Sequence, residues 1–355
     1  MSNITNSSTI NLINSISSEV NAYMTLFIFI FGTIGNSLNT IVLAQAKLRS
    51  NPCVLYFLGS SISSLGIILV GLPTRLIAGW ISTDPTNTNS LLCKLRIFLL
   101  YGFRTTSVWL IVLATMDRWF VSSVRVKRRF LSCHRIARKS IIVVYVLSFL
   151  LWTQSLYCYN TGLPEAPLKC YGMTSTCRIF NDVVYACSTV IVPSILMLIF
   201  GFLTIHNISR SLRVITPYIN MVSNINSMNA TKRRKPRPNN SSLTGMLLLQ
   251  VILLTVLSLP QAIHQFYLTF SISIIKSPLR YAIENLIINF DFSLTYVGNS
   301  IPFYIYTLTG ALFRQTLIRL FRSIYRQWKS YLLNFIVDFN NFFFTVVRSR
   351  KINFN

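Results

Sequence analysis

The residues that could do the most distinctive chemistry are two charges inside long apolar runs. Arg104 lies within residues 97–116, and Asp291 lies within residues 285–313. A charge in such a run is costly to bury, so it faces a cavity or pairs with a partner. Arg104 therefore predicts either a site for an anionic group of a ligand or an internal ion pair with Asp291, and both can hold in alternate states.

Other polar residues extend this candidate site. Gln261 and Gln265 are further potential partners for Arg104, and Arg96, two turns earlier on the same predicted helix, would extend a basic wall. The predicted ligand-binding set is Arg96, Arg104, Gln261, Gln265 and Asp291. Acidic residues near the ends of the runs suit a cationic group of a ligand; they are Glu165, Asp182 and Glu284.

The sequence offers no catalytic or metal-binding constellation. His264 and Ser258 are six residues apart and form no nucleophile–base set. The three histidines are scattered, and no Cys/His cluster has ligand spacing. We therefore expect no enzyme activity, no metal and no cofactor.

Composition places the chain in the membrane class. Of its 355 residues, 52% are hydrophobic and only 12% are charged, whereas soluble domains carry about 25% charged residues. The net charge of +25 would suggest nucleic acid in a soluble protein. Because the Lys and Arg residues cluster between apolar runs, they indicate orientation in a bilayer, and nucleic-acid binding is excluded.

Seven apolar runs are long enough to cross a bilayer as helices. They are residues 24–46, 50–74, 97–116, 140–164, 183–209, 238–275 and 285–313. Their length and uniformity exclude the alternating strands of a barrel. The predicted fold is an all-α, seven-transmembrane helix bundle with a short amphipathic eighth helix.

Basic residues predict the orientation. Four segments hold 25 of the 33 Lys and Arg residues, namely 47–49, 118–139, 210–237 and the tail from Arg314. Positive charge marks the cytoplasmic side, so the N-terminus is expected outside a multi-pass protein of the plasma membrane. Sequons at Asn3 and Asn6 predict glycosylation of the outer segment.

The predicted organisation has four parts. They are an extracellular segment at 1–21, a seven-transmembrane domain at 22–310, an amphipathic helix at 311–330 and a cytoplasmic tail at 331–355. Prolines and polar residues at 210–243 predict a flexible loop. Leucines, phenylalanines and arginines alternate at helical spacing after Leu312, which predicts a helix on the inner membrane surface. Residues 331–347 are read as a second surface segment, with an eighth span as the alternative.

A spaced pair of motifs carries a family resemblance. Cys93 opens the third run, and Asp117-Arg118-Trp119 closes it 24 residues later, about 36 Å along a helix. In this the chain resembles the rhodopsin-like family of G-protein-coupled receptors over roughly residues 22–330. Further landmarks in the family's order are Asn36, Trp152, Pro193, Pro260, and Tyr306 seven residues before Phe313.

Departures from the family pattern also matter. Serines fill the stretch 60–64 where the family has a sodium-binding Asp, and Leu257-Ser258-Leu259 precedes Pro260 in place of Cys-Trp. Near the end of the last run, Pro302-Phe303 replaces Asn-Pro, with Asn299 three residues before. This stretch looks more like invertebrate neuropeptide receptors of the FMRFamide type.

The resemblance implies roles for particular residues. It implies a disulfide between Cys93 and either Cys170 or Cys177. The one of these two that does not bond to Cys93 can form a second disulfide with Cys158. It also implies that Arg118 pairs with Asp117 at rest and turns toward a heterotrimeric G protein on activation. Together with Trp119 and Tyr306, these residues form the expected coupling site.

The resulting hypothesis is a receptor in the lipid bilayer for an extracellular ligand. A short neuropeptide is expected, and binding would shift the population toward a state with an open inner face. A small-molecule chemoreceptor of the same fold is the alternative. A transporter is less favoured, because no internal repeat or pair of broken spans is visible.

Overall fold

The computed structural model describes the backbone of residues 2–81, 86, 88–162, 170–225, 239–271, 274 and 276–352. Within those ranges, the side chains of 2–7, 78, 79, 81, 212–225, 239–242 and 337–352 are not described. The two predicted glycosylation sites, Asn3 and Asn6, and the predicted acidic point Glu165 therefore lie outside the described side chains.

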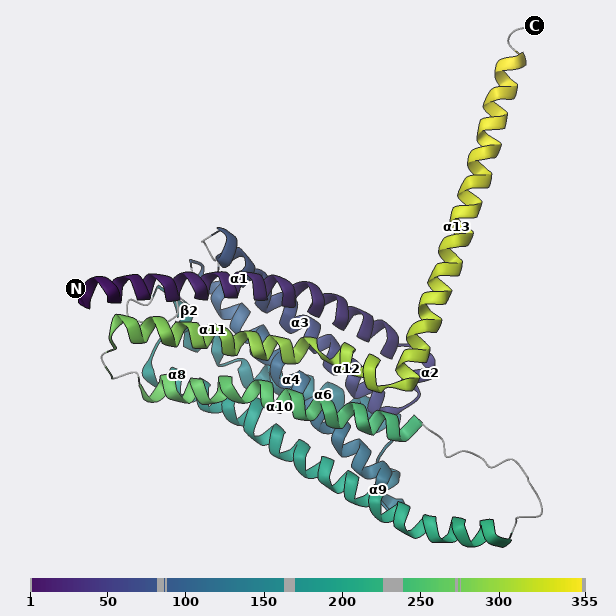
Figure 1. Cartoon of the computed structure of the whole chain (residues 1–355), viewed down its shortest axis with the longest axis horizontal. Helices are drawn as coiled ribbons and strands as arrows, with labels where there is room; N and C mark the ends of the chain where they lie inside the picture. The colour runs from purple at the N-terminus through teal and green to yellow at the C-terminus, as the bar shows by residue number, and fades with distance from the viewer. Residues whose placement is uncertain are drawn as a thin grey trace.

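The protein is a bundle of long helices that lie side by side (Figure 1). Its first half consists of α1 (Ser2–Leu43), α2 (Ala46–Arg49), α3 (Pro52–Ile81), α4 (Ser90–Ser122), α5 (Val126–Arg129), α6 (His134–Trp152) and α7 (Ser155–Cys158). A hairpin of β1 (Tyr159–Thr161) and β2 (Cys170–Gly172) follows. Its second half consists of α8 (Ser175–Tyr185), η2 (Ala186–Ile191), α9 (Val192–Ile225), α10 (Asn239–Phe270), α11 (Pro278–Ser300), α12 (Pro302–Thr309) and α13 (Ala311–Ile352).

Six helical stretches of the described chain are long and apolar enough to cross a membrane. They are Ser8–Leu43, Pro52–Ile77, Ser90–Ser122, His134–Cys158, Ser175–Ser211 and Leu243–Phe270. The seventh predicted crossing, 285–313, is divided between α11 and α12 at Ile301, and α11 packs between α1 and α10. The predicted all-α membrane bundle is confirmed, with its last crossing broken where Asn299, Ser300 and Pro302 interrupt the apolar run.

The fourth predicted span, 140–164, is wrong at its outer end. The helix α6 ends at Trp152, and Tyr159–Thr161 instead forms β1, which pairs antiparallel with β2. The prediction overran because it counted charges, and a charge-free strand looks the same as a charge-free helix in such a count.

The predicted loop at 210–243 is helical at both of its ends, and residues 226–238 lie outside the described residues. The helix α9 continues to Ile225 and α10 begins at Asn239, so helix replaces loop at 210–225 and 239–243. A helix does not have to end where the hydrocarbon ends, and the Ser, Leu, Arg and Ile residues there are compatible with continued helix. The expected extracellular segment 1–21 is likewise helical from Ser2, in line with the first span.

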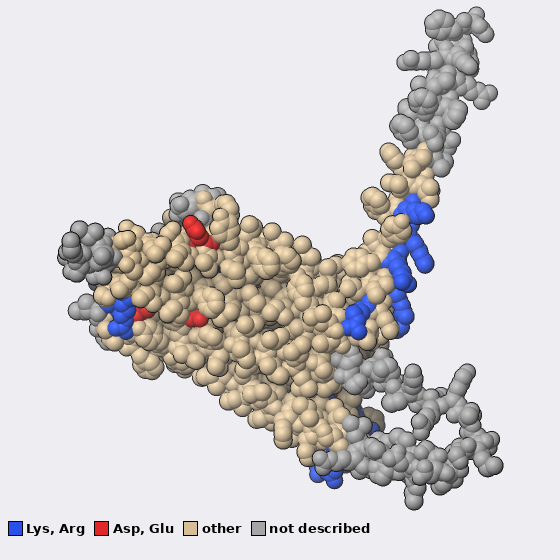
Figure 2. Space-filling view, viewed as in Figure 1, with Lys and Arg blue, Asp and Glu red and all other residues tan. Residues whose placement is uncertain are grey.

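The C-terminal region forms one helix and not two segments. The helix α13 runs from Ala311 to Ile352 and leaves the bundle at a sharp angle (Figure 1). The apolar residues of one helix face recur every three or four positions on both sides of residue 330, so the same amphipathic helix continues past the predicted boundary. These residues are Phe313, Leu317, Leu320, Ile324, Trp328, Tyr331 and Phe335. Figure 2 shows Lys and Arg along the part of this helix nearest the bundle.

A layer of buried polar side chains crosses the middle of the bundle. Asn36 on α1 donates to the backbone oxygen of Asn299 on α11 at 3.0 Å. Ser60 on α3 and Ser107 on α4 share a hydrogen bond of 2.9 Å. Interhelical hydrogen bonds between small polar residues hold membrane helices together without a hydrophobic driving force. The serines that replace the family's acidic residue therefore connect α3 to α4.

Gly71 on α3 packs tightly against Tyr296 of α11. A Cβ atom at this position would lie 2.1 Å from the phenolic oxygen of Tyr296, which is itself buried. Gly245, on α10, has nothing within 4 Å of its Cβ position. A side chain is therefore excluded at Gly71 by Tyr296, whereas Gly245 has room for one.

We expect Gly71→Val to lower surface expression strongly, because the added side chain would force α3 and α11 apart. Gly245→Val should express close to wild type. Surface labelling of an epitope-tagged receptor measures both. Equal expression of the two variants would contradict the packing described.

Candidate functional site

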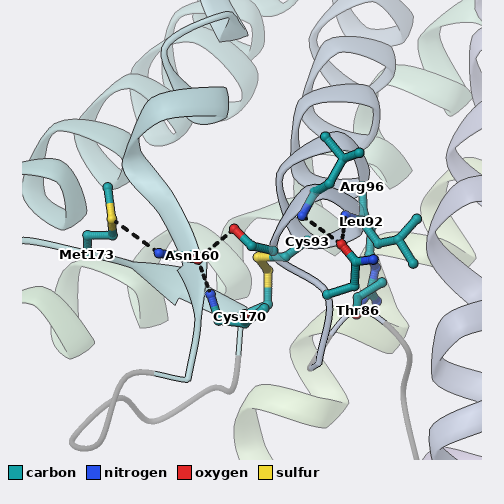
Figure 3. The surroundings of a disulfide bond; sticks show 11 residues. Thr86, Leu92, Cys93, Arg96, Asn160, Cys170 and Met173 are labelled. Carbon is teal, nitrogen blue, oxygen red and sulfur yellow. Dashed lines mark hydrogen bonds between the residues drawn. A yellow bond between two sulfur atoms is a disulfide. The ribbon is translucent and has the colours of Figure 1, made fainter.

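The ends of the bundle that the basic residues predict to lie outside and inside the cell are called the outer end and the inner end. Two disulfides fix the outer end. Cys93, in the first turn of α4, is joined to Cys170 of β2 (Figure 3). Cys158, the last residue of α7, is joined to Cys177 of α8. Of the pairings left open by the sequence, the structure has Cys93 with Cys170. The hairpin is thereby held against the start of α4.

Polar contacts reinforce this arrangement. Ser90 on α4 donates to Asn160 of β1 at 2.6 Å, and Asn160 donates to the sulfur of Met173 at 3.6 Å (Figure 3). Arg178 donates to the backbone oxygen of Gly172 at 2.9 Å. The hairpin is therefore attached to α4 on one side and to α8 on the other, next to the outer ends of the helices.

Arg104 lies below this hairpin in the centre of the bundle and is only 2% exposed. Its Nη1 donates to the amide oxygen of Gln261 on α10 at 3.3 Å and to the phenolic oxygen of Tyr185 on α8 at 3.4 Å. The guanidinium also lies 5.0 Å from the ring centroid of Tyr296 on α11. A single side chain thus contacts three other helices, and Gln261 is confirmed as its partner.

Asp291 pairs with a different residue. Its Oδ2 atom lies 2.8 Å from Nδ1 of His264, which joins α11 to α10. The ion pair between Arg104 and Asp291 that the sequence allowed is therefore absent from the described contacts. The contact between Asp291 and His264 was not predicted, because only Arg104 was weighed as a partner for Asp291.

The remaining members of the predicted set have other contacts. Arg96 donates to Thr86 at 3.1 Å and to the backbone oxygen of Gly71 at 3.4 Å, so its guanidinium contacts α3. Gln265 follows Gln261 by one turn on α10, and its buried Oε1 has no hydrogen-bond partner among the described residues. The basic wall expected from Arg96 to Arg104 stays a prediction.

Glu284 and Asp182, the two described members of the predicted acidic set, are already engaged. Glu284 accepts from Lys276 at 2.6 Å and from Arg280 at 3.0 Å. Asp182 accepts a hydrogen bond from Thr269. Since two cations contact Glu284, it is not the free acidic point that the sequence suggested.

Several residues near Arg104 were not predicted. Thr105 shares a hydrogen bond of 3.1 Å with Thr189 of η2, and Trp152 donates to Thr105 at 2.8 Å. Tyr101 packs between Trp152 and Tyr185, with ring centroids 4.6 Å and 5.3 Å away. Trp152 was noted only as a family landmark, and no charge or motif marks the others, so only the helix packing could place them beside Arg104. The three aromatic rings form a wall next to the guanidinium.

The inner end carries a second buried arginine. Arg118 is 3% exposed and Asp117 is 4% exposed, and the two side chains form an ion pair at 2.6 Å. Arg118 also donates to Asn51 at 2.9 Å, and Asp117 accepts from Ser132 at 2.6 Å. The expected pair of Asp117 and Arg118 is therefore present, with further contacts to the loops on either side.

Tyr306 of α12 packs into the apolar cluster at the inner end of the bundle. Its hydroxyl donates to Gln250 of α10 at 2.5 Å, and its ring packs on Phe57 and Phe313. Leu243, Met246 and Leu247 of α10 belong to the same buried apolar cluster. Trp119 stacks on Phe200 of α9 with centroids 5.4 Å apart. The inner ends of the helices are thus packed together in this structure.

The disulfide at Cys93 generates a direct test. We expect Cys93→Ser to reduce surface expression strongly, because it releases the hairpin from α4 and removes the constraint on a 77-residue loop. Cys133→Ser should be tolerated, because that cysteine is free. Flow cytometry of intact cells compares them, and equal expression would argue against a structural role for the bond.

Comparison with known proteins agrees with this architecture. The family described as 7 transmembrane receptor (rhodopsin family) matches residues 35–301, well over half of the chain. Neuromedin-U receptor 1 of Mus musculus is 26% identical over 149 residues, which are 41% of this chain and 34% of that protein. The match thus spans about a third of the relative's length. From residues 35–301 and the bundle they form, the chain belongs to the rhodopsin family of seven-transmembrane receptors, a multi-pass membrane protein and not an enzyme.

Proposed function

We propose that this receptor binds a short extracellular peptide near Arg104 and activates a heterotrimeric G protein through its inner face. The observation that carries the proposal is the buried pair of Asp117 and Arg118 beneath a packed inner end. A guanidinium held by an adjacent carboxylate can exchange that contact for a protein partner when the covering helix moves.

The helix α10 is the element that could couple the two ends. It carries Gln261, the partner of Arg104, and Gln250, the partner of Tyr306, 11 residues apart or about 16 Å along the helix. Pro260 removes one backbone hydrogen bond between them and gives the helix a place to bend. A ligand that alters the Gln261 contact would therefore bias the Gln250 contact.

A peptide is the favoured ligand class. The mouse relative is named as a receptor for neuromedin-U, a neuropeptide. The hairpin held by the Cys93–Cys170 disulfide also lies next to the outer helix ends, where its backbone and polar groups are available to a ligand that extends beyond Arg104. Both observations support a ligand that extends from the hairpin down to Arg104.

The proposed orientation places residues 1–21 outside and residues 311–355 inside, in the plasma membrane. The support is the distribution of Lys and Arg between the spans. The proposed receptor domain at 22–310 then lies between an outer segment that contains Asn3 and Asn6 and an inner helix at 311–330 continued by the tail at 331–355.

Epitope tags at the two ends test this orientation. Antibody against an N-terminal tag should label intact cells, and antibody against a C-terminal tag should label only permeabilised cells. Labelling of both tags on intact cells would overturn the proposed orientation.

A ligand-free measurement tests the proposed coupling. We expect Asp117→Asn to raise basal nucleotide exchange on G proteins several-fold, because it weakens the hold on Arg118 at its 2.6 Å contact. Adding Arg118→Ala should return exchange to background. The matched control is Lys47→Ala, an exposed cation of α2 that follows the inner end of α1. Unchanged exchange in Asp117→Asn, assayed in membranes against G proteins of every class, would contradict the proposal.

A further inference from the structure

We propose that the ligand presents a carboxylate, which Arg104 binds through the side of its guanidinium formed by Nε and Nη2. This inference rests on the proposed function, since it names the chemistry recognised at the same ligand site. It follows from the hydrogen bonds that Arg104 makes, those that it lacks, and the charges around it.

The side chain of Arg104 is only partly satisfied. An arginine has five N–H donors, and Arg104 uses only Nη1, toward Gln261 and Tyr185. Its Nε and Nη2 atoms are buried and have no hydrogen-bond partner among the described residues. Buried donors are nearly always paired, so this pair of donors indicates a missing acceptor.

The two unpaired atoms have a specific geometry. In a guanidinium, the Nε–H bond and one Nη2–H bond are parallel and lie on one edge of the plane. That edge matches the two oxygens of a carboxylate and binds them with two parallel hydrogen bonds. The contacts to Gln261 and Tyr185 occupy the opposite Nη1 atom and so hold the plane in place without using this edge.

Gln261 offers a third donor at the same site. Its Oε1 atom accepts from Arg104 at 3.3 Å and from Thr295 at 2.6 Å, which fixes the orientation of the amide. Its Nε2 atom is consequently a donor, and it is buried without a partner in the described structure. Three N–H donor atoms therefore lack acceptors around one buried positive charge.

No described acidic residue neutralises Arg104. Asp117, Asp182, Glu284 and Asp291 are each engaged elsewhere, by Arg118, by Thr269, by Lys276 with Arg280, and by His264 respectively. Glu19 is exposed on α1. The ring of Tyr296, 5.0 Å away, supplies only a partial counter-charge. An anion that neutralises the Arg104 guanidinium would therefore have to come from outside the described chain.

Other occupants fit less well. A water molecule can accept from one or two of the donors but brings no negative charge. A ligand amine would meet a like charge, which disfavours binding. A peptide can supply the carboxylate from its C-terminus or from an Asp or Glu side chain, and these two sources share the chemistry that Arg104 recognises.

Three peptide pools distinguish the sources. All are random tetrapeptides. The first contains uncharged residues with a free C-terminal carboxylate, the second contains the same residues with a C-terminal amide, and the third is amidated but contains one Asp or Glu. Thermal stability of the purified, lipid-reconstituted receptor, titrated with each pool into the millimolar range, reports binding.

We expect the first or the third pool to stabilise the wild-type receptor, and the second to do so at least about tenfold more weakly. A response to the first assigns the C-terminal carboxylate, and a response to the third assigns an acidic side chain. Arg104→Gln should weaken the effective pool about tenfold or more, since the bidentate contact is lost. The matched control Arg75→Gln, an arginine of α3 that contacts Asn21 and Phe292, should not.

Folding can be separated from recognition. Arg104→Gln should be as stable as wild type without peptide, because it removes an uncompensated buried charge. If that variant fails to fold, Arg104→Lys serves instead. It keeps the charge but lacks the two-donor edge, so its response to the effective pool should still fall several-fold.

Equal stabilisation by the amidated neutral pool and the carboxylate pools would overturn the inference. So would the absence of stabilisation by either carboxylate pool, or an undiminished response in Arg104→Gln. None of these results bears on basal nucleotide exchange in Asp117→Asn, so a failed carboxylate assignment and a failed G-protein proposal remain distinguishable.

Discussion

The rest of the structure depends on one constraint, which is that a polar group inside this bundle has no water to bond. Each buried donor, acceptor or charge must find a partner on another helix or remain unsatisfied at a cost. The helices are accordingly joined at three levels, by Arg104 with Gln261, by Ser60 with Ser107, and by Tyr306 with Gln250. Apolar packing fills the space between these contacts.

The three levels differ in whether their buried polar groups carry charge. The middle level consists of neutral serine and asparagine contacts between helices, although Asn36 Oδ1 has no hydrogen-bond partner among the described residues. The outer and inner levels each contain a buried arginine with unpaired N–H atoms, namely Nε and Nη2 of Arg104 and Nε of Arg118. A buried positive charge with open donors at each end can respond to a partner from outside the bundle.

The sequence predicted the features that depend on composition and long spacing. Charge-free runs located the membrane helices, and the interval from Cys93 to Arg118 identified both ends of α4. The disulfide partner of Cys93 could not be chosen, because Cys170 and Cys177 are both near in sequence, and only the hairpin places Cys170 against α4. Similarly, Asp291 and Arg104 are the only charges inside their runs, yet helix rotation directs Asp291 to His264.

The extents of helices were the least predictable feature. Hydrophobicity reports where a chain lies in a bilayer and does not report where the backbone stops being helical. For this reason α9 and α13 continue past their expected ends, and α6 stops short of its expected end. The contacts that link helices, such as Tyr306 with Gln250, were missed because neither residue carries a charge.

The central claim is that the packed inner end is one of two states and that a G protein selects the other. Spin labels at the native Cys133 and at Gly245→Cys, in a receptor that also carries Cys187→Ser, report the separation of the inner ends of α6 and α10. Cys53 is free but fully buried and is not expected to react.

Pulsed electron paramagnetic resonance should give a single short distance between the two labels for the receptor without G protein. With nucleotide-free G protein, that distance should increase by about 5 Å or more. The same distance distribution with and without every G-protein class would contradict the account.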